Sequence, residues 1–210
     1  MITLYSSPGT AGLVVHWLLL ELEVPHEVRT LDLDAGEHKQ PAYLAINPSG
    51  VVPALMIDGQ PICEAAAIAL HLADAHPARG FAPAPGTLER ALYYRWMFFL
   101  ANTVQPAFRA WFYPTEPAGE AHVDAVKAQA RGRIEGAWTL LDAHLASHGP
   151  HLLGDKLTTA DFMLTMLMRW SRNMPKTATA WPALARLASA MKARPTFKEL
   201  YAREGLTDWT

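Results

Sequence analysis

Glu64 opens an alanine-rich segment, 64–75, whose composition predicts a helix directly after the short apolar run that ends at Cys63. The first turn of a helix has unpaired N–H groups and the positive end of the helix dipole, and both attract a carboxylate. Glu64 and Ala65 therefore mark a place where the carboxylate of a ligand could bind. An ordinary acidic residue in the first turn of a helix would show the same pattern.

Pro53 precedes an apolar run in "VVPAL", which predicts the start of a strand. Proline has no N–H for a sheet ladder, so in sheets it occurs at strand starts, edges and bulges. The run "PALMI" is followed by Asp58-Gly59 and then by "QPIC", and this dipeptide suits a type I′ hairpin turn. The segment therefore predicts an antiparallel hairpin that begins at a proline and ends at Glu64.

The segments before the hairpin predict alternating strands and helices. "ITLYS" (2–6) and "HEVRTLDL" (26–33) predict strands, and residues 11–23, which are apolar on nearly all sides, predict a buried helix. The polar stretch 35–50 predicts a loop with one or two helical turns. With the hairpin and the helix at 64–75 the order is β-α-β-α-β-β-α, which combines a parallel crossover with an antiparallel hairpin.

A stretch rich in proline and glycine follows, and we expect an interdomain linker at 78–86. After it the apolar residues repeat at helical spacing, and no strand is predicted. Helices are expected at 88–112, at 120–147, and from about Thr158, Pro182 and Thr196. The sequence therefore predicts an α/β domain at 1–77 and an all-α domain at 87–210.

Composition narrows the classes of partner. The formal net charge of −2 gives no electrostatic reason to expect nucleic acid or an anionic membrane. The single cysteine, Cys63, excludes an intrachain disulfide, and only His144 and His148 among the nine histidines have helical i, i+4 spacing, so no metal is expected. The N-terminus lacks the features of a signal peptide, so a cytoplasmic protein is expected.

Three segments resemble the glutathione S-transferases, most closely their bacterial, beta-like members: "INPSGVVPAL", "CEAAAIALHLAD" and "HLLGDKLTTADFMLTMLMRW". The resemblance covers nearly the whole chain. It implies a thioredoxin-like N-terminal domain and an all-α helical bundle as the C-terminal domain. It also implies a homodimer that serves detoxification, in which glutathione, the cosubstrate, is activated as a thiolate and attacks a small hydrophobic electrophile.

The resemblance implies where glutathione binds. The proline that matches Pro53 is cis in this family, which turns the N–H and C=O of Val52 outward to pair with the cysteinyl unit of glutathione. The γ-glutamyl carboxylate would lie on the N–H of Ala65, and Glu64 would pair with the ammonium group of the ligand.

Two departures from the family affect this binding site. Many relatives have a serine at position 65, so Ala65 is expected to weaken glutathione binding by roughly 0.5–1.5 kcal/mol. A lysine or glutamine often precedes the Val-Pro pair, but this chain has Val51. Lys39 is therefore expected to meet the glycine carboxylate of glutathione, with His38 or Gln40 as alternatives.

Catalysis in this family needs a hydroxyl or a cysteine near the end of the first strand or the start of the first helix, where it stabilises the thiolate. The cysteine of beta-class relatives falls on Ala11, and the serine of several other classes falls nearest Gly9. The hydroxyls that remain are those of Thr10, Tyr5, Ser7 and Ser6. Thr10 is ranked first as the group that stabilises the thiolate because it lies nearest the helix start, and Tyr5 and Ser7 come next. Ser6, or backbone N–H groups without a hydroxyl, are the remaining alternatives.

These departures leave an alternative function open, a non-catalytic binding protein for glutathione or a hydrophobic ligand on the same fold. A glutathione-dependent reductase or peroxidase is disfavoured because position 11 is Ala11. Cys63 has no resolving partner and is expected to be a buried structural thiol.

Thr158-Thr159-Ala160-Asp161 predicts a capping box at the start of a helix, in which the Thr158 hydroxyl and the Asp161 carboxylate satisfy free N–H groups. This motif is expected to contribute stability and not catalysis.

Overall fold

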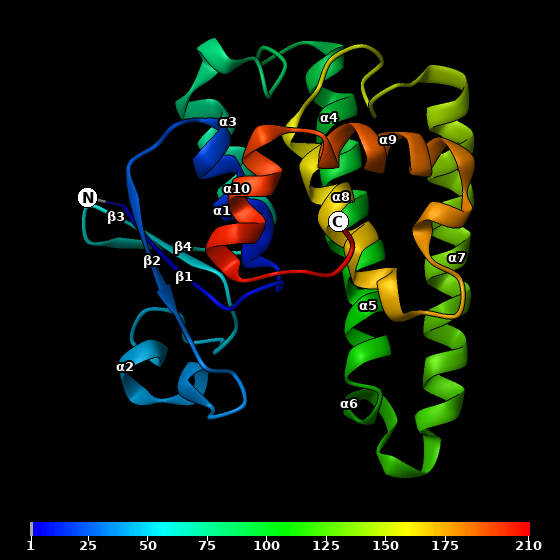
Figure 1. Ribbon diagram of the computed structural model, residues 1–210. Coiled ribbons are helices and arrows are strands. Elements are labelled where there is room, and N and C mark those ends of the chain that lie inside the picture. Colours follow the sequence, from blue (N-terminus) through cyan, green and yellow to red (C-terminus); the bar gives the residue numbers. More distant parts are fainter. Residues whose placement is uncertain (1) are drawn as a thin grey trace. The chain divides into compact units, whose positions relative to one another are not determined.

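The computed structural model describes residues 2–210, which form two compact units (Figure 1). The first unit contains the sheet and comprises the chain up to Ala82 together with Lys192–Thr210. The second unit, Pro83–Met191, is helical. The boundary between Ala82 and Pro83 lies inside the segment 78–86 that the composition predicts as a linker.

A four-stranded mixed sheet forms the centre of the first unit, in the order β2-β1-β3-β4. The strands are β1 (Ile2–Ser6), β2 (His26–Thr30), β3 (Ala54–Ile57) and β4 (Gln60–Cys63). β1 pairs in parallel with β2, whereas β1 with β3 and β3 with β4 are antiparallel. This mixture of parallel crossover and antiparallel hairpin is the one that the sequence predicts.

The helices of the first unit complete the expected β-α-β-α-β-β-α order. They are α1 (Gly12–Glu21), α2 (Pro41–Leu44) and α3 (Ala65–Ala75), with a 3-10 turn at Glu37–Lys39 before α2. Every residue of α1 is buried, as its lack of a polar side predicts. The turn of the hairpin has positive φ at both Asp58 (48°) and Gly59 (83°), as a type I′ turn requires.

α10 (Pro195–Glu204) belongs to the unit that contains the sheet, although its sequence position suggested the helical domain. The indole of Trp17 in α1 donates to Thr196 Oγ1 at 3.1 Å. Arg194 forms two hydrogen bonds with the Glu21 carboxylate, at 2.6 and 2.7 Å. An apolar face at helical spacing shows that a helix is buried but not which of two cores buries it, so the sequence did not reveal this placement.

Helices form the second unit, and two isolated β-bridges lie in the loop at 151–156 among the residues described. Its α-helices are α4 (Leu88–Phe99), α5 (Gln105–Phe112), α6 (Thr115–Ala118), α7 (Val123–His148), α8 (Thr159–Trp170) and α9 (Pro182–Lys192). Its largest fully buried side chains are those of Tyr93, Phe108, Trp138 and Phe162. The expected helix 88–112 is present, but a π-helical segment, Leu100–Val104, divides it.

Pro106 explains this division. A proline inside a helix lacks the N–H for the hydrogen bond to the residue four positions earlier, and its ring clashes with that carbonyl. Widening the preceding turn to π geometry accommodates the proline without ending the helix.

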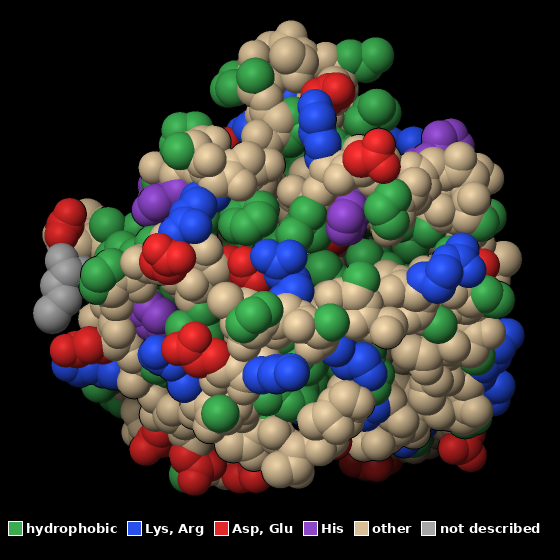
Figure 2. All heavy atoms as spheres, turned by 45° about the horizontal axis from the view of Figure 1, so that its top comes forward, with side chains coloured by type: hydrophobic (Ala, Val, Ile, Leu, Met, Phe, Trp, Pro, Cys, Tyr) green, Lys and Arg blue, Asp and Glu red, His purple; other side chains and the backbone are tan. Residues whose placement is uncertain are grey.

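On the face drawn in Figure 2, basic and acidic side chains are interspersed, with hydrophobic side chains between them. Within residues 2–210, none of the helices has both the length and the apolar character needed to cross a bilayer.

Candidate functional site

The peptide bond between Val52 and Pro53 is cis, as the resemblance implies. Pairing of β1 with β3 starts at Tyr5 and Ala54, so Val52 lies just outside the sheet ladder. An extended peptide can add to backbone groups at such a position in the manner of an added strand.

The backbone before Val52 is held in place by two side chains. The Tyr43 hydroxyl and the Asn47 side-chain amide each donate to the Val51 carbonyl at 2.7 Å. Burial raises the pKa of Tyr43 to about 12, so this hydroxyl remains a proton donor at neutral pH. Tyr43 and Asn47 are not among the site residues that the sequence predicts, although "NPSG" is a strong turn signal.

Lys39 lies beside the same segment. Its Nζ donates to the Gly50 carbonyl at 2.7 Å, two residues before Val52. Gly50 has a φ of +59°, and a Cβ at this position would lie 3.0 Å from Lys39 Nζ and 3.1 Å from the His38 carbonyl oxygen. The structure therefore brings the expected cation to the cis-proline segment, and a glycine makes the close approach possible.

Glu64 precedes α3 with an uncommon backbone conformation, φ 70° and ψ 111°. A non-glycine residue in this region is strained, and such strain occurs preferentially at functional sites. The Glu64 side chain is exposed and forms no capping hydrogen bond, while Ala65, the first residue of α3, is buried. The start of α3 thus has unpaired N–H groups with an acidic side chain beside them.

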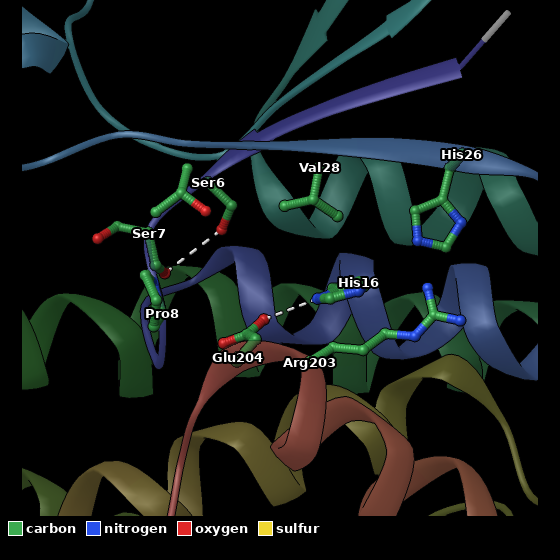
Figure 3. A pocket seen from close by; sticks show the side chains of 9 residues that line it. Ser6, Ser7, Pro8, His16, His26, Val28, Arg203 and Glu204 are labelled. Atoms are coloured by element: carbon green, nitrogen blue, oxygen red, sulfur yellow. Dashed lines mark hydrogen bonds and ion pairs between the residues drawn. The ribbon is translucent and has the colours of Figure 1, made fainter.

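Ser6, at the end of β1, lies against the start of α1. A Cβ on Gly12 would overlap the Ser6 hydroxyl oxygen and would lie 3.5 Å from Pro53 Cβ. The Ser6 hydroxyl therefore occupies the space that a side chain at position 12 would fill, close to the cis-proline. Its one hydrogen bond among the described residues is long, 3.4 Å to the Ser7 carbonyl (Figure 3).

Thr10 lies in the same turn, but its hydroxyl is engaged locally. Thr10 Oγ1 donates to the Ser7 carbonyl at 2.6 Å and accepts from the Gly12 N–H at 3.4 Å. A hydroxyl has one proton to donate, and that of Thr10 is already used in a short bond.

Tyr5 lies on the opposite face of the sheet from Ser6, because successive side chains of a strand alternate. Its ring is 6.0 Å from that of Tyr43, and the Arg29 guanidinium lies 5.8 Å from its centroid. Ser7 lines a cavity next to α1 and β2, which Figure 3 shows. The structure therefore brings Ser6 and Thr10 to the start of α1 and places Tyr5 elsewhere.

Cys63 is a free, half-buried thiol directly before Glu64. Burial, together with the charge of Glu64, raises the pKa of this thiol. A raised pKa keeps the thiol protonated and weakly nucleophilic. The expected full burial of Cys63 is not found, because the thiol lies at the end of the edge strand β4 and is only half-buried.

Comparisons with known proteins agree with this geometry. Residues 1–74 match the family model "Glutathione S-transferase, N-terminal domain", and residues 102–204 match "Glutathione S-transferase, C-terminal domain". Glutathione S-transferase GST-4.5 of Xanthomonas campestris pv. campestris is 31% identical over 204 residues, which cover 97% of this chain and 98% of that protein.

Solved structures of the same family are also similar. A sphingomonad glutathione S-transferase complexed with glutathione is 33% identical with a TM-score of 0.86, covering 98% of this chain and 100% of that one. A bacterial beta-class glutathione S-transferase from Sphingomonas chungbukensis is 28% identical with the same TM-score of 0.86 and the same coverage. With its thioredoxin-like domain, cis-proline and helical C-terminal domain, the chain belongs to the glutathione S-transferase family of enzymes.

Proposed function

We propose that this protein binds glutathione along Val52 and the start of α3, ionises its thiol, and transfers it to a small hydrophobic electrophile. The observation that carries the proposal is the packing of Gly12 on both Ser6 and Pro53. It puts a hydroxyl with a proton to donate beside the backbone that would hold the cysteinyl unit of glutathione.

Each part of glutathione has a partner of matching chemistry in this arrangement. The cysteinyl backbone would pair with the N–H and C=O of Val52. The γ-glutamyl carboxylate would accept from the Ala65 N–H, and its ammonium group would pair with Glu64. Lys39 Nζ, which uses one of its three protons on Gly50, would meet the glycine carboxylate with another.

Among the candidate hydroxyls, Ser6 is the one we assign to the thiolate. The thiolate needs a hydrogen-bond donor, and the Thr10 proton is engaged in a 2.6 Å bond whereas the Ser6 contact is 3.4 Å. The first turn of α1 would add its dipole to the same anion. The rate gain would come from a larger thiolate population and from holding both reactants together.

Isothermal titration calorimetry with glutathione, in two buffers of different ionisation enthalpy, tests the proposal. S-methylglutathione is the matched control because it has the same backbone and no ionisable thiol. We expect both ligands to bind and only glutathione to release a proton near neutral pH. Equal binding without proton release would assign a binding protein without thiol activation, and absence of binding would remove the ligand assignment.

Assembly as a homodimer, a cytoplasmic location and a role in detoxification are part of the same proposal. Their support is family membership, and size-exclusion chromatography with light scattering tests the dimer directly.

A further inference from the structure

Two histidines of the first unit, His16 on α1 and His26 on β2, face one cavity of about 320 Å³ (Figure 3). Val28 of β2 and Arg203 and Glu204 of α10 also line it. The His16 side chain is 3% exposed, and its ring lies 5.4 Å from the His26 ring at an interplanar angle of 81°. Ser6 and Ser7 line the other end of the cavity, but the two histidines have no part in the glutathione site proposed above.

In each histidine, the hydrogen-bond partner of Nδ1 fixes the tautomer of the neutral ring. His26 Nδ1 lies 2.7 Å from the Val24 carbonyl oxygen, which can only accept, so this nitrogen carries the proton. His16 Nδ1 lies 2.9 Å from Glu204 Oε1, and a carboxylate likewise accepts. With the proton on Nδ1, the Nε2 atom of each neutral imidazole is a bare acceptor.

Both Nε2 atoms are buried and have no hydrogen-bond partner among the described residues. A buried acceptor without a donor is costly, so its presence calls for a ligand. In Figure 3 the His26 ring points from β2 toward the end of the His16 ring. Two imidazoles bound to one tetrahedral metal through Nε2, at bonds of about 2.0–2.1 Å, have their centroids roughly 5 Å apart.

The surroundings suit a cation. The Arg203 guanidinium is paired with Glu199 at 2.6 Å, which leaves the carboxylate of Glu204 to the His16 ring. A metal-bound histidine usually donates its other N–H to a carboxylate or a backbone carbonyl, which orients the ring. Glu204 serves His16 in this way, and Val24 serves His26.

We propose that His16 and His26 form a two-imidazole site for a divalent transition metal such as Ni²⁺, Cu²⁺ or Zn²⁺, with water completing the coordination. Imidazole is a preferred ligand of these ions. Residues 2–210 contain no cluster of three or more His, Cys, Asp or Glu side chains suited to a metal, so the site depends on this pair. Sequence spacing predicted no metal, and it did not single out these two histidines, which are ten positions apart on α1 and β2.

Calorimetric titration of the untagged protein with NiCl₂, in buffer without glutathione, tests the site. We expect one ion per chain, with affinity reduced at least tenfold in His16→Gln and in His26→Phe. His122→Ala removes an exposed histidine outside the cavity and is the matched control, with unchanged affinity expected. Glu204→Gln should weaken binding by roughly 10–100-fold, as removal of an orienting partner does.

Electron paramagnetic resonance of the Cu²⁺ complex provides an independent readout, with hyperfine splitting from two imidazole nitrogens expected. Circular dichroism and thermal unfolding establish that each variant is folded, and His26→Phe covers the case in which His16→Gln unfolds. Absence of binding, unchanged affinity in the folded variants, equal loss in His122→Ala, or splitting from a single nitrogen would each overturn the proposal.

Discussion

Two helix starts in this protein use similar sequence signals in opposite ways. At α8 the carboxylate of Asp161, which is 0% exposed, accepts from the N–H groups of Thr158 and Leu152, each at 2.8 Å. At α3 the residue before the helix, Glu64, has a strained backbone and an exposed carboxylate that caps nothing. Both helix starts carry an acidic residue, but only the carboxylate at α8 accepts hydrogen bonds from N–H groups of the protein.

The capped start of α8 contributes stability, whereas the uncapped start of α3 is available for ligand binding. A helix start that is capped by its own side chains has fewer N–H groups left for a ligand, and removing the cap leaves buried donors unpaired. A helix start that is left open, next to a strained residue, loses that stabilisation and remains ready for a carboxylate. We therefore expect substitutions at Asp161 to affect folding and substitutions at Glu64 to affect ligand binding.

The largest expected effect is that of Asp161→Ala. The change leaves the buried N–H groups of Thr158 and Leu152 without acceptors, which should lower the free energy of unfolding by about 3 kcal/mol. For a chain of this size the melting temperature should fall by roughly 6–12 °C. Thermal unfolding measures this effect, and glutathione titration of the folded variant should give the wild-type affinity.

Asp161→Asn is the control, because it retains an acceptor oxygen and should cost less stability. An unchanged melting temperature in Asp161→Ala would contradict the capping role. A loss of glutathione affinity in the folded variant would contradict the expectation that Asp161 affects folding and not ligand binding.

The next effect concerns a third helix start, that of α1. Ser6→Ala removes the donor proposed for the thiolate, so the pKa of bound glutathione should rise by about 1 unit. At pH values below this pKa, kcat/KM should fall about tenfold, and the pH–rate profile should move to higher pH. Steady-state kinetics with a chlorinated nitroaromatic between pH 5.5 and 9 measures both.

Thr10→Val is the matched control for Ser6→Ala. Its hydroxyl is already bonded to the Ser7 carbonyl, so its loss should lower stability and leave the pH–rate profile in place. The reverse result, with a shifted profile in Thr10→Val only, would assign the thiolate to Thr10.

Glu64→Gly should change stability and binding in opposite directions. Glycine adopts positive φ without strain, so the free energy of unfolding should rise by about 1 kcal/mol. Loss of the carboxylate should weaken glutathione binding roughly tenfold. Glu64→Ala keeps the strain and removes the same carboxylate, so weaker binding without added stability is expected there; equal melting temperatures in the two variants would exclude stored strain.

The smallest effect is on Cys63. Its thiol pKa lies above the ordinary value of 9.0 because of burial and the adjacent Glu64 charge, so alkylation by iodoacetamide should be slow at neutral pH and rise only in alkaline solution. Glu64→Gln removes the charge and should move the alkylation profile to lower pH. An unchanged profile would leave burial as the sole cause of the raised pKa.

Local patterns in the sequence predicted much of the architecture. The Asp58-Gly59 turn, the alternating strands and helices of the first unit and the capping box at Thr158 depend on residues that are near one another in the chain. The assignment of α10 to the sheet-containing unit depends on Glu21, more than 170 residues away from Arg194, and no local signal reports such a contact.

The candidate site divides in the same way. Turn, strand and helix signals mark the positions of Pro53, Glu64 and Ala65, and the resemblance to the family implied the binding roles of these residues and of Val52. The ranking of the hydroxyls was not decided by proximity in sequence. Thr10 is nearer the start of α1, but only the folded chain shows that its proton is engaged and that Ser6 fills the space at Gly12.

By itself, the sequence determined which elements form, which residues end them and which family the segments resemble, because these depend on backbone propensities and on residues a few positions apart. Tertiary structure alone decided that α10 packs on α1, that Ser6 and Pro53 both lie against Gly12 and that His16 and His26 share a cavity. These contacts depend on the packing of side chains from segments far apart in the chain, and the spacing of residues along the sequence does not predict such contacts.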